Sequence, residues 1–137
     1  MDEATEQASS EAFAYKYRRL RTAVARLVRS DTLGSPVPNG YTTVDQADRI
    51  ARAIVLAPGD RLLDLGAGRG WPGSRIAALS GCDLVTVDLP LTALREAREH
   101  MRRRDIGRAG AVVCGDGARL PFRDACFQAV THADVLC

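Results

Sequence analysis

Apolar positions along the chain follow two periods that alternate from residue 10 onward. Spacings of three and four are typical of a helix with one buried face, whereas short apolar runs, often β-branched, are typical of buried strands. Helices are predicted at 10–29, 42–56, 72–80 and 90–106. Strands are predicted at 61–65, 82–89, 111–114 and 127–135. Proline and glycine mark the connections, most clearly in the loop at 31–40.

Strands that alternate with helices predict an α/β fold, a partial doubly wound parallel sheet with helices on its faces. A chain of 137 residues has room for one such domain, with a sheet of few strands. We expect residues 1–40 to form an N-terminal helix and linker, and residues 41–137 to form the domain. A second N-terminal helix, capped by Thr42 or Thr43, should precede the first strand.

The first strand leads into a glycine-rich loop within the stretch RLLDLGAGRGWPG, residues 61–73. Gly66, Gly68 and Gly70 can adopt positive φ angles and let a ligand approach the main chain without a Cβ in the way. Pro72 suits the start of the next helix, whose unpaired N–H groups face the loop. This order of elements predicts a nucleotide-type binding site, although such a loop can also be a plain tight turn.

The spacing of the glycines distinguishes two kinds of nucleotide site. The dinucleotide motif G-x-G-x-x-G requires a glycine where this chain has Trp71. The pattern present is D-x-G-x-G-x-G, with Asp64 at the end of the strand. A dinucleotide-dependent oxidoreductase stays the alternative, favoured by Asp88, which lies 20 residues beyond Gly68.

Acidic residues stand at three successive strand ends, namely Asp64, Asp88 and Asp116, and His132 and Asp134 stand at the fourth. Ligands of a parallel sheet bind outside the carboxyl ends of its strands. A lone acid at such a position is usually a turn residue or a helix cap. Three acids together with a glycine loop predict a single binding site at this edge of the sheet.

These motifs resemble those of class I S-adenosylmethionine-dependent methyltransferases. LDLGAGRG is similar to the family's first motif, VTVDLP to its acidic second-strand end, and CGDGARLPFRDACFQAV to its third motif and following strand. The resemblance covers most of residues 38–137. It departs from the family's pattern at Leu89-Pro90, where D-x-S is common, and at Gln128, where the family usually has Asp.

The resemblance implies that S-adenosylmethionine binds at the strand ends. The matching cofactor-binding positions are Asp64, Gly66, Gly68, Gly70, Asp88, Leu89, Asp116, Gly117 and Ala118. In the family's arrangement Asp88 would accept both ribose hydroxyls, and Asp116 would accept from the adenine amino group. The glycines would approach the methionine part, and Asp64 would anchor the loop and help to position the ammonium group. Leu89 would pack on the adenine ring, and the two residues after Asp116 would offer main-chain contacts.

Methyl transfer from a sulfonium is an in-line displacement, so alignment of the reactants supplies much of the rate and a base is optional. His132 is the only histidine near the expected site and is the candidate catalytic residue, as a general base for a hydroxyl or ammonium acceptor. It could instead line the pocket or make a structural hydrogen bond. His100, within a charged helix, should face solvent.

Composition narrows the classes of partner. The net charge is +2 and no basic stripe carries interleaved aromatic residues, which favours a small-molecule acceptor over nucleic acid. Cys82, Cys114 and Cys126 lie in or beside apolar runs without C-x-x-C spacing, so we expect buried free thiols and no metal site. An acidic start without an apolar run, and no stretch of membrane-spanning length, predict a cytoplasmic protein without membrane contact.

The resemblance also implies a sheet of seven strands in the order 3-2-1-4-5-7-6, of which this sequence supplies the first four, in the order 3-2-1-4. We therefore expect a truncated piece of a longer methyltransferase that lacks robust activity by itself. Its fourth strand, predicted from Phe127 to Val135, would form an exposed apolar edge that favours self-association. A chain that binds cofactor or a partner without catalysis is the remaining alternative.

Overall fold

The computed structural model describes residues 11–12, 15, 41–106 and 111–135. Within these residues, helices and strands alternate along the chain. The elements are α3 (Val44–Ile54), β1 (Arg61–Leu65), α4 (Gly73–Ser80), β2 (Asp83–Asp88), α5 (Leu91–Arg103), β3 (Ala111–Cys114) and β4 (Ala129–Thr131). The helix predicted at 10–29 and the loop at 31–40 lie outside the described residues, apart from positions 11, 12 and 15, which are helical.

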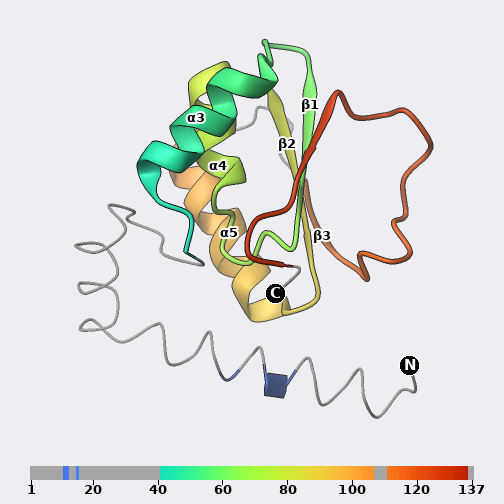
Figure 1. The fold of residues 1–137 in the computed structure, drawn as a ribbon. Coiled ribbons are helices and arrows are strands. Elements are labelled where there is room, and N and C mark those ends of the chain that lie inside the picture. Colours follow the sequence, from blue (N-terminus) through green and yellow to red (C-terminus); the bar gives the residue numbers. More distant parts are fainter. Residues whose placement is uncertain (1–10, 13–14, 16–40, 107–110, 136–137) are drawn as a thin grey trace.

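The strands form one parallel sheet in the order β3-β2-β1-β4, which confirms the predicted fold class and strand order. Figure 1 shows α3, α4 and α5 together on one side of the sheet, while the connection between β3 and β4 (orange) extends from the other side. Because the strands are parallel, their carboxyl ends share one edge, and the glycine loop follows β1 at that edge.

Local signals set the ends of α3 and α4. Thr43 is the N-cap of α3 in a capping box: its Oγ1 accepts from the Gln46 amide at 3.2 Å, and the Gln46 side chain accepts from the Thr43 amide at 2.8 Å. Gly81 ends α4 with a φ of 73°, and its amide donates to the Ala77 carbonyl at 2.8 Å. Both boundaries agree with the sequence.

The core lies between the sheet and the helices. Its buried side chains are Leu62, Ile76, Ala77, Cys82, Leu84 and Met101. Burial of large apolar side chains stabilises a fold by about 1.5–3 kcal/mol each. Since Leu62 and Leu84 are partners in the β1–β2 register, this core fixes the two strand ends that carry Asp64 and Asp88.

Two elements are shorter than predicted. The fourth strand covers only Ala129–Thr131. Its pairing with β1 begins at the hydrogen bond from the Gln128 amide to the Arg61 carbonyl. The chain then turns at Asp134, which has a φ of 59°. The prediction of a strand over 127–135 was therefore wrong at both ends. Helix α5 ends at Arg103 rather than near residue 106, since Asp105 adopts a φ of 50°.

Two burial predictions also need correction. His100 is half-buried rather than facing solvent, and this burial, with the nearby charge of Arg104, lowers its pKa. Cys82, Cys114 and Cys126 are free as expected, but only Cys82 is buried. Cys114 is exposed because it ends β3, the outermost strand on that side of the described sheet.

Candidate functional site

The glycine loop forms the centre of the candidate site. Gly66, Gly68 and Gly70 all have positive φ angles, of 68°, 53° and 89°. The amides of Gly66 and Ala67 both donate to the Val87 carbonyl, at 2.8 and 3.2 Å, so the loop folds over the end of β2. A Cβ at Gly66 would collide with the side chain of Val135. Both the backbone conformation and the close approach of Val135 therefore require glycine there.

Asp88 joins the end of β2 to this loop. Its Oδ2 accepts from the Gly68 amide at 2.6 Å, and its Oδ1 accepts from the Leu89 amide at 2.8 Å. Burial raises the pKa of this carboxyl, while the two hydrogen bonds oppose that rise. A carboxylate oxygen can accept more than one hydrogen bond, so the fixed Asp88 carboxylate can still accept from two hydroxyls of a ligand.

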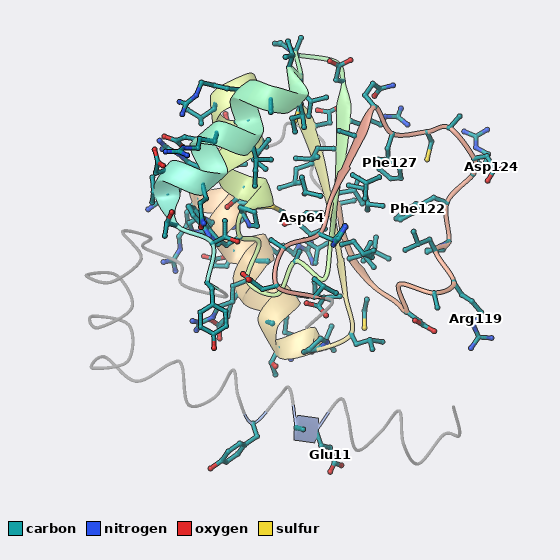
Figure 2. The ribbon with its side chains drawn as sticks, in the orientation of Figure 1. Glu11, Asp64, Arg119, Phe122, Asp124 and Phe127 are labelled. Atoms are coloured by element: carbon teal, nitrogen blue, oxygen red, sulfur yellow. The ribbon has the colours of Figure 1, made fainter. Side chains whose placement is uncertain are left out.

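Asp64 lies in the interior of the molecule, between the sheet and the helices (Figure 2). It is only 1% exposed, and it accepts from the Gly73 amide and from the Thr131 hydroxyl, both at 3.1 Å. Burial raises its pKa to about 7, and the nearby charge of Asp88 adds to the rise. Asp64 thus links β1 to β4 and to the start of α4. Its predicted contact with a ligand ammonium stays a prediction.

Asp116 lies at the same edge, after β3. The preceding residue, Gly115, donates its amide to the Asp88 carbonyl at 3.0 Å, which brings the two acids' main chains together. The Asp116 carboxylate accepts from the Ala118 amide at 2.8 Å, so that amide serves the loop itself. At Gly117 a Cβ would lie 3.1 Å from Leu65 Cδ1, a tight approach between this loop and the end of β1.

The structure thus brings most of the predicted cofactor-binding residues to one edge of the sheet. Leu89 is half-buried, and its carbonyl accepts from the Cys114 thiol at 3.3 Å. His132 directly follows β4 and is exposed. No geometry among the described residues links it to the carboxylates of the loop, so its catalytic role stays a prediction.

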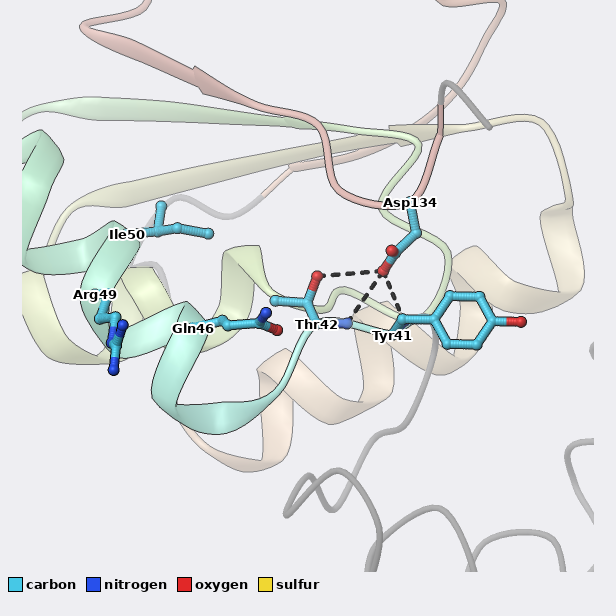
Figure 3. A pocket seen from close by; sticks show the side chains of 6 residues that line it. All are labelled: Tyr41, Thr42, Gln46, Arg49, Ile50 and Asp134. Carbon is cyan, nitrogen blue, oxygen red and sulfur yellow. Dashed lines mark hydrogen bonds between the residues drawn. The ribbon is translucent and has the colours of Figure 1, made fainter.

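A set of contacts that the sequence did not predict ties the segment before α3 to this edge. The Asp134 Oδ2 accepts from the amides of Tyr41 and Thr42, at 2.8 and 3.3 Å, and from the Thr42 hydroxyl at 3.2 Å (Figure 3). The Trp71 indole donates to the Thr42 carbonyl at 2.7 Å. We call these contacts the Thr42 brace. They link the segment after β4 and the end of the glycine loop to the segment before α3.

A pocket of about 430 Å³ adjoins the Thr42 brace, within the size range of small-molecule sites. Its lining residues are Tyr41, Thr42, Gln46, Arg49, Ile50 and Asp134 (Figure 3). It shares Tyr41, Thr42 and Asp134 with the brace, and the residue after Asp134 packs on Gly66. The pocket is therefore close to the glycine loop, on the side of α3.

Two absences apply to the part of the chain that the structure describes. No group of His, Cys, Asp and Glu residues there is arranged to hold a metal ion. No helix in that part is long and apolar enough to cross a membrane.

The parallel order β3-β2-β1-β4, the glycine loop after β1 and the acid at the end of β2 define the architecture of a class I S-adenosylmethionine-dependent methyltransferase domain. Comparison with known proteins agrees with this class. A family model described as methyltransferase domain matches residues 62–137, more than half of the chain, and the chain belongs to this family.

Individual relatives show how much of a whole enzyme this chain covers. It is 36% identical over 90 residues to 24-methylenesterol C-methyltransferase 2 of Oryza sativa subsp. japonica, covering 66% of this chain and 25% of the relative. It is 43% identical over 83 residues to a demethylmenaquinone methyltransferase of Corynebacterium urealyticum, covering 61% and 32%. The chain thus spans about a quarter to a third of these relatives.

Solved structures share the fold. The geranyl diphosphate C-methyltransferase of Streptomyces coelicolor A3(2) superposes with a TM-score of 0.59 at 21% identity, over 64% of this chain and 33% of that chain. The [4+2]-cyclase SpnF superposes with a TM-score of 0.54 at 27% identity, over 67% and 35%.

Proposed function

We propose that this chain is the cofactor-binding part of an enzyme that transfers a methyl group from S-adenosylmethionine to a small-molecule acceptor. One observation carries the proposal: the half-buried Asp88 carboxylate is held by the Gly68 and Leu89 amides directly beside a loop of positive-φ glycines. This arrangement suits a ligand that presents a diol to the carboxylate and a chain of atoms to the bare main chain.

The other predicted residues complete this proposed site. Asp88 would accept from the ribose hydroxyls, and Asp116 from the adenine amino group with Leu89 against the ring. Asp64 would act mainly through the loop that it anchors, because its oxygens already accept from Gly73 and Thr131. The strands are parallel and end at one edge of the sheet, so these residues lie where a single ligand could contact them all, which supports the proposed roles.

Bound S-adenosylmethionine supplies an electrophilic methyl carbon. The chain's own part is to hold the donor so that an acceptor can reach that carbon in line with the sulfur, and to keep water away from it. If the acceptor is a hydroxyl or an ammonium group, it must lose a proton, and the exposed His132 after β4 is the candidate to take it. A neutral imidazole can do so near neutral pH.

The acceptor class is proposed from the relatives and the pocket. The relatives include enzymes named for methylenesterol and demethylmenaquinone, which are largely apolar, and for geranyl diphosphate, which joins an apolar chain to a charged group. The pocket beside the Thr42 brace combines Ile50 with the polar side chains of Gln46 and Arg49. We propose an apolar acceptor with one polar group, taken up at this side of the glycine loop.

Location and larger partners are also proposed. We propose a cytoplasmic location, and the small net charge of +2 supports a partner other than nucleic acid. Self-association through β4 would follow from the apolar edge of that strand.

Calorimetric titration with S-adenosylhomocysteine tests the cofactor assignment. Asp88→Ala removes hydrogen bonds to a charged group worth about 1.5–3 kcal/mol each, so affinity should fall at least about tenfold. Asp88→Asn is the matched control, because its amide keeps one acceptor for the Gly68 amide and should leave the loop folded. Unchanged affinity in both variants would defeat the ribose assignment, and saturable binding of NAD instead would favour the oxidoreductase alternative.

A second candidate function is chemistry other than methyl transfer on a methyltransferase fold. The likeness to a protein named as a [4+2]-cyclase supports it. Incubation with S-adenosylmethionine labelled at the methyl group, and with quinone, sterol and prenyl diphosphate acceptors, separates the two. Label transfer supports the first function, whereas conversion of one of these molecules to a product that carries no label favours the second.

A further inference from the structure

Arg69 is a charged residue buried inside the glycine loop. Its side chain is 5% exposed although it stands between Gly68 and Gly70. Its guanidinium forms an ion pair with Glu96 of α5, whose side chain is 30% exposed. Its Nε is buried and, among the described residues, meets no hydrogen-bond acceptor.

Neither the conformation of the turn nor a gain in folding stability accounts for the burial of Arg69. The positive φ angles on either side of Arg69 belong to glycines, and the turn itself needs no charge at residue 69. A buried ion pair loses the hydration of both charges and is often no more stable than an apolar pair of the same size. The unmet Nε adds to that cost. Such a pair has its best-attested use in fixing one arrangement of two elements against others.

The two elements joined by the pair build the candidate site. Arg69 belongs to the loop after β1, and Glu96 belongs to α5, which begins at Leu91, just after Asp88. The loop also lies close to the same turn of α5, since a Cβ at Gly70 would be 3.4 Å from the Ala97 Cβ. The pair therefore sets how the loop lies against the segment that carries Asp88.

We propose that Arg69 and Glu96 are positioning residues that hold the glycine loop against α5. In this position the Gly68 amide donates to the Asp88 carboxylate. Asp88 and the glycine loop are then at the right separation to bind the ribose and the methionine part of the cofactor. The pair acts through the loop and Asp88 and does not itself touch the ligand. This inference rests on the proposed cofactor site and adds to it a determinant of cofactor affinity.

The test compares variants of the full chain by calorimetry with S-adenosylhomocysteine and by urea unfolding. Arg69→Met keeps a long side chain without charge, and we expect its affinity to fall about tenfold or more, since small displacements of a binding group have large effects. The double variant Arg69→Met with Glu96→Met removes the unpaired charge and should recover stability but not affinity. Arg69→Lys keeps the positive charge but lacks the planar guanidinium with its several N–H donors, and it should retain part of the affinity.

Arg75→Met is the matched control. Arg75 pairs with Asp48 at 2.7 Å between α4 and α3, and neither residue belongs to the glycine loop or to α5, so its loss should lower stability and leave affinity unchanged. A ligand-free readout is the hydrogen exchange of the Gly68 amide, which should quicken in the Arg69 variants only.

The outcomes separate this inference from the proposed function. If the double variant recovers affinity together with stability, or Arg69→Met binds as Arg75→Met does, the pair is merely structural and the inference is overturned. If the wild-type chain binds no S-adenosylhomocysteine, the proposed function fails and the role in cofactor affinity fails with it.

Discussion

Buried carboxyls control the site at the scale of single residues. Asp64 and Asp88 lie at adjacent strand ends, and burial raises the pKa of both. Asp88 keeps partial contact with solvent and faces the loop's amides, whereas Asp64 is enclosed by protein donors. The first is suited to bind a ligand, and the second to hold the fold around it.

The state of Asp64 should appear in the pH dependence of stability. Its pKa rises from 3.8 to about 7 on folding. Between these values the folded protein keeps a proton that the unfolded chain has lost, so the contribution of Asp64 to the free energy of unfolding falls as pH rises, by an amount on the order of 2–4 kcal/mol, and levels off above about pH 7. Urea unfolding of wild type and Asp64→Asn from pH 4 to 8 measures this. The variant should gain on the wild type as pH rises, and parallel curves would show that Asp64 is ionised in the folded protein throughout.

The sequence predicts those site residues whose signal is local. Gly66 and Gly68 are marked by their spacing, and Asp88 by its place at a strand end. Thr131 and Asp134 could not be assigned their roles, because their partners lie 67 and 92 or 93 positions away along the chain. Hydrogen bonds over such separations depend on the tertiary fold, and no local pattern encodes them.

At the scale of elements, the Thr42 brace joins three segments that meet at the binding edge. Asp134, in the segment after β4, and Trp71, at the end of the glycine loop, both bond to Thr42, just before α3 begins. The position of α3 is therefore coupled to the loop. The acceptor pocket proposed here has walls on α3 and on Asp134, so the same contacts define its shape.

Removal of Asp134 should loosen this brace. Asp134→Ala leaves the amides of Tyr41 and Thr42 without their acceptor, and because the site is exposed the cost should be about 1 kcal/mol. Trp71 is the only tryptophan of the chain and its indole bonds to Thr42, so its fluorescence should shift to the red. Asp45→Ala, which breaks an exposed ion pair with Arg49 on α3, is the control and should leave the spectrum unchanged. An unchanged spectrum in Asp134→Ala would show that the Trp71 contact does not depend on the brace.

Elements were predicted best where caps and periodicity agree. The predicted cap at Thr42 or Thr43 gave the start of α3, and the glycine at 81 gave the end of α4. The apolar run after Phe127 predicted too long a strand, because a run of apolar residues does not show where the neighbouring strand stops offering partners. Here β1 pairs with β4 only from Leu62 to Asp64.

At the scale of the whole molecule, alternating strands and helices and the order β3-β2-β1-β4 followed from the sequence and its family resemblance. The same resemblance predicted that the fourth strand would be an exposed edge of the sheet. Among the described residues β4 pairs with β1 alone, and Val130 on β4 is 55% exposed. Unpaired amides and carbonyls beside an exposed valine favour association with another strand.

The chain should therefore self-associate through β4. Val130→Lys places a charge on the exposed strand and should shift sedimentation toward the monomer, since lysine is a common protection of sheet edges. Leu79→Lys is the matched control, because Leu79 is 51% exposed on α4, away from β4. A wild-type chain that sediments as a monomer at all concentrations would contradict this prediction.

The central claim is that the glycine loop and the ends of β2 and β3 bind S-adenosylmethionine. Amide chemical shifts of the labelled chain, titrated with S-adenosylhomocysteine, test it most directly. Saturable shifts are expected at Gly66, Gly68, Gly70, Leu89 and Gly117, with no comparable shifts when NAD is added. Shifts that cluster elsewhere, or the same amides saturating with NAD and not with S-adenosylhomocysteine, would contradict it.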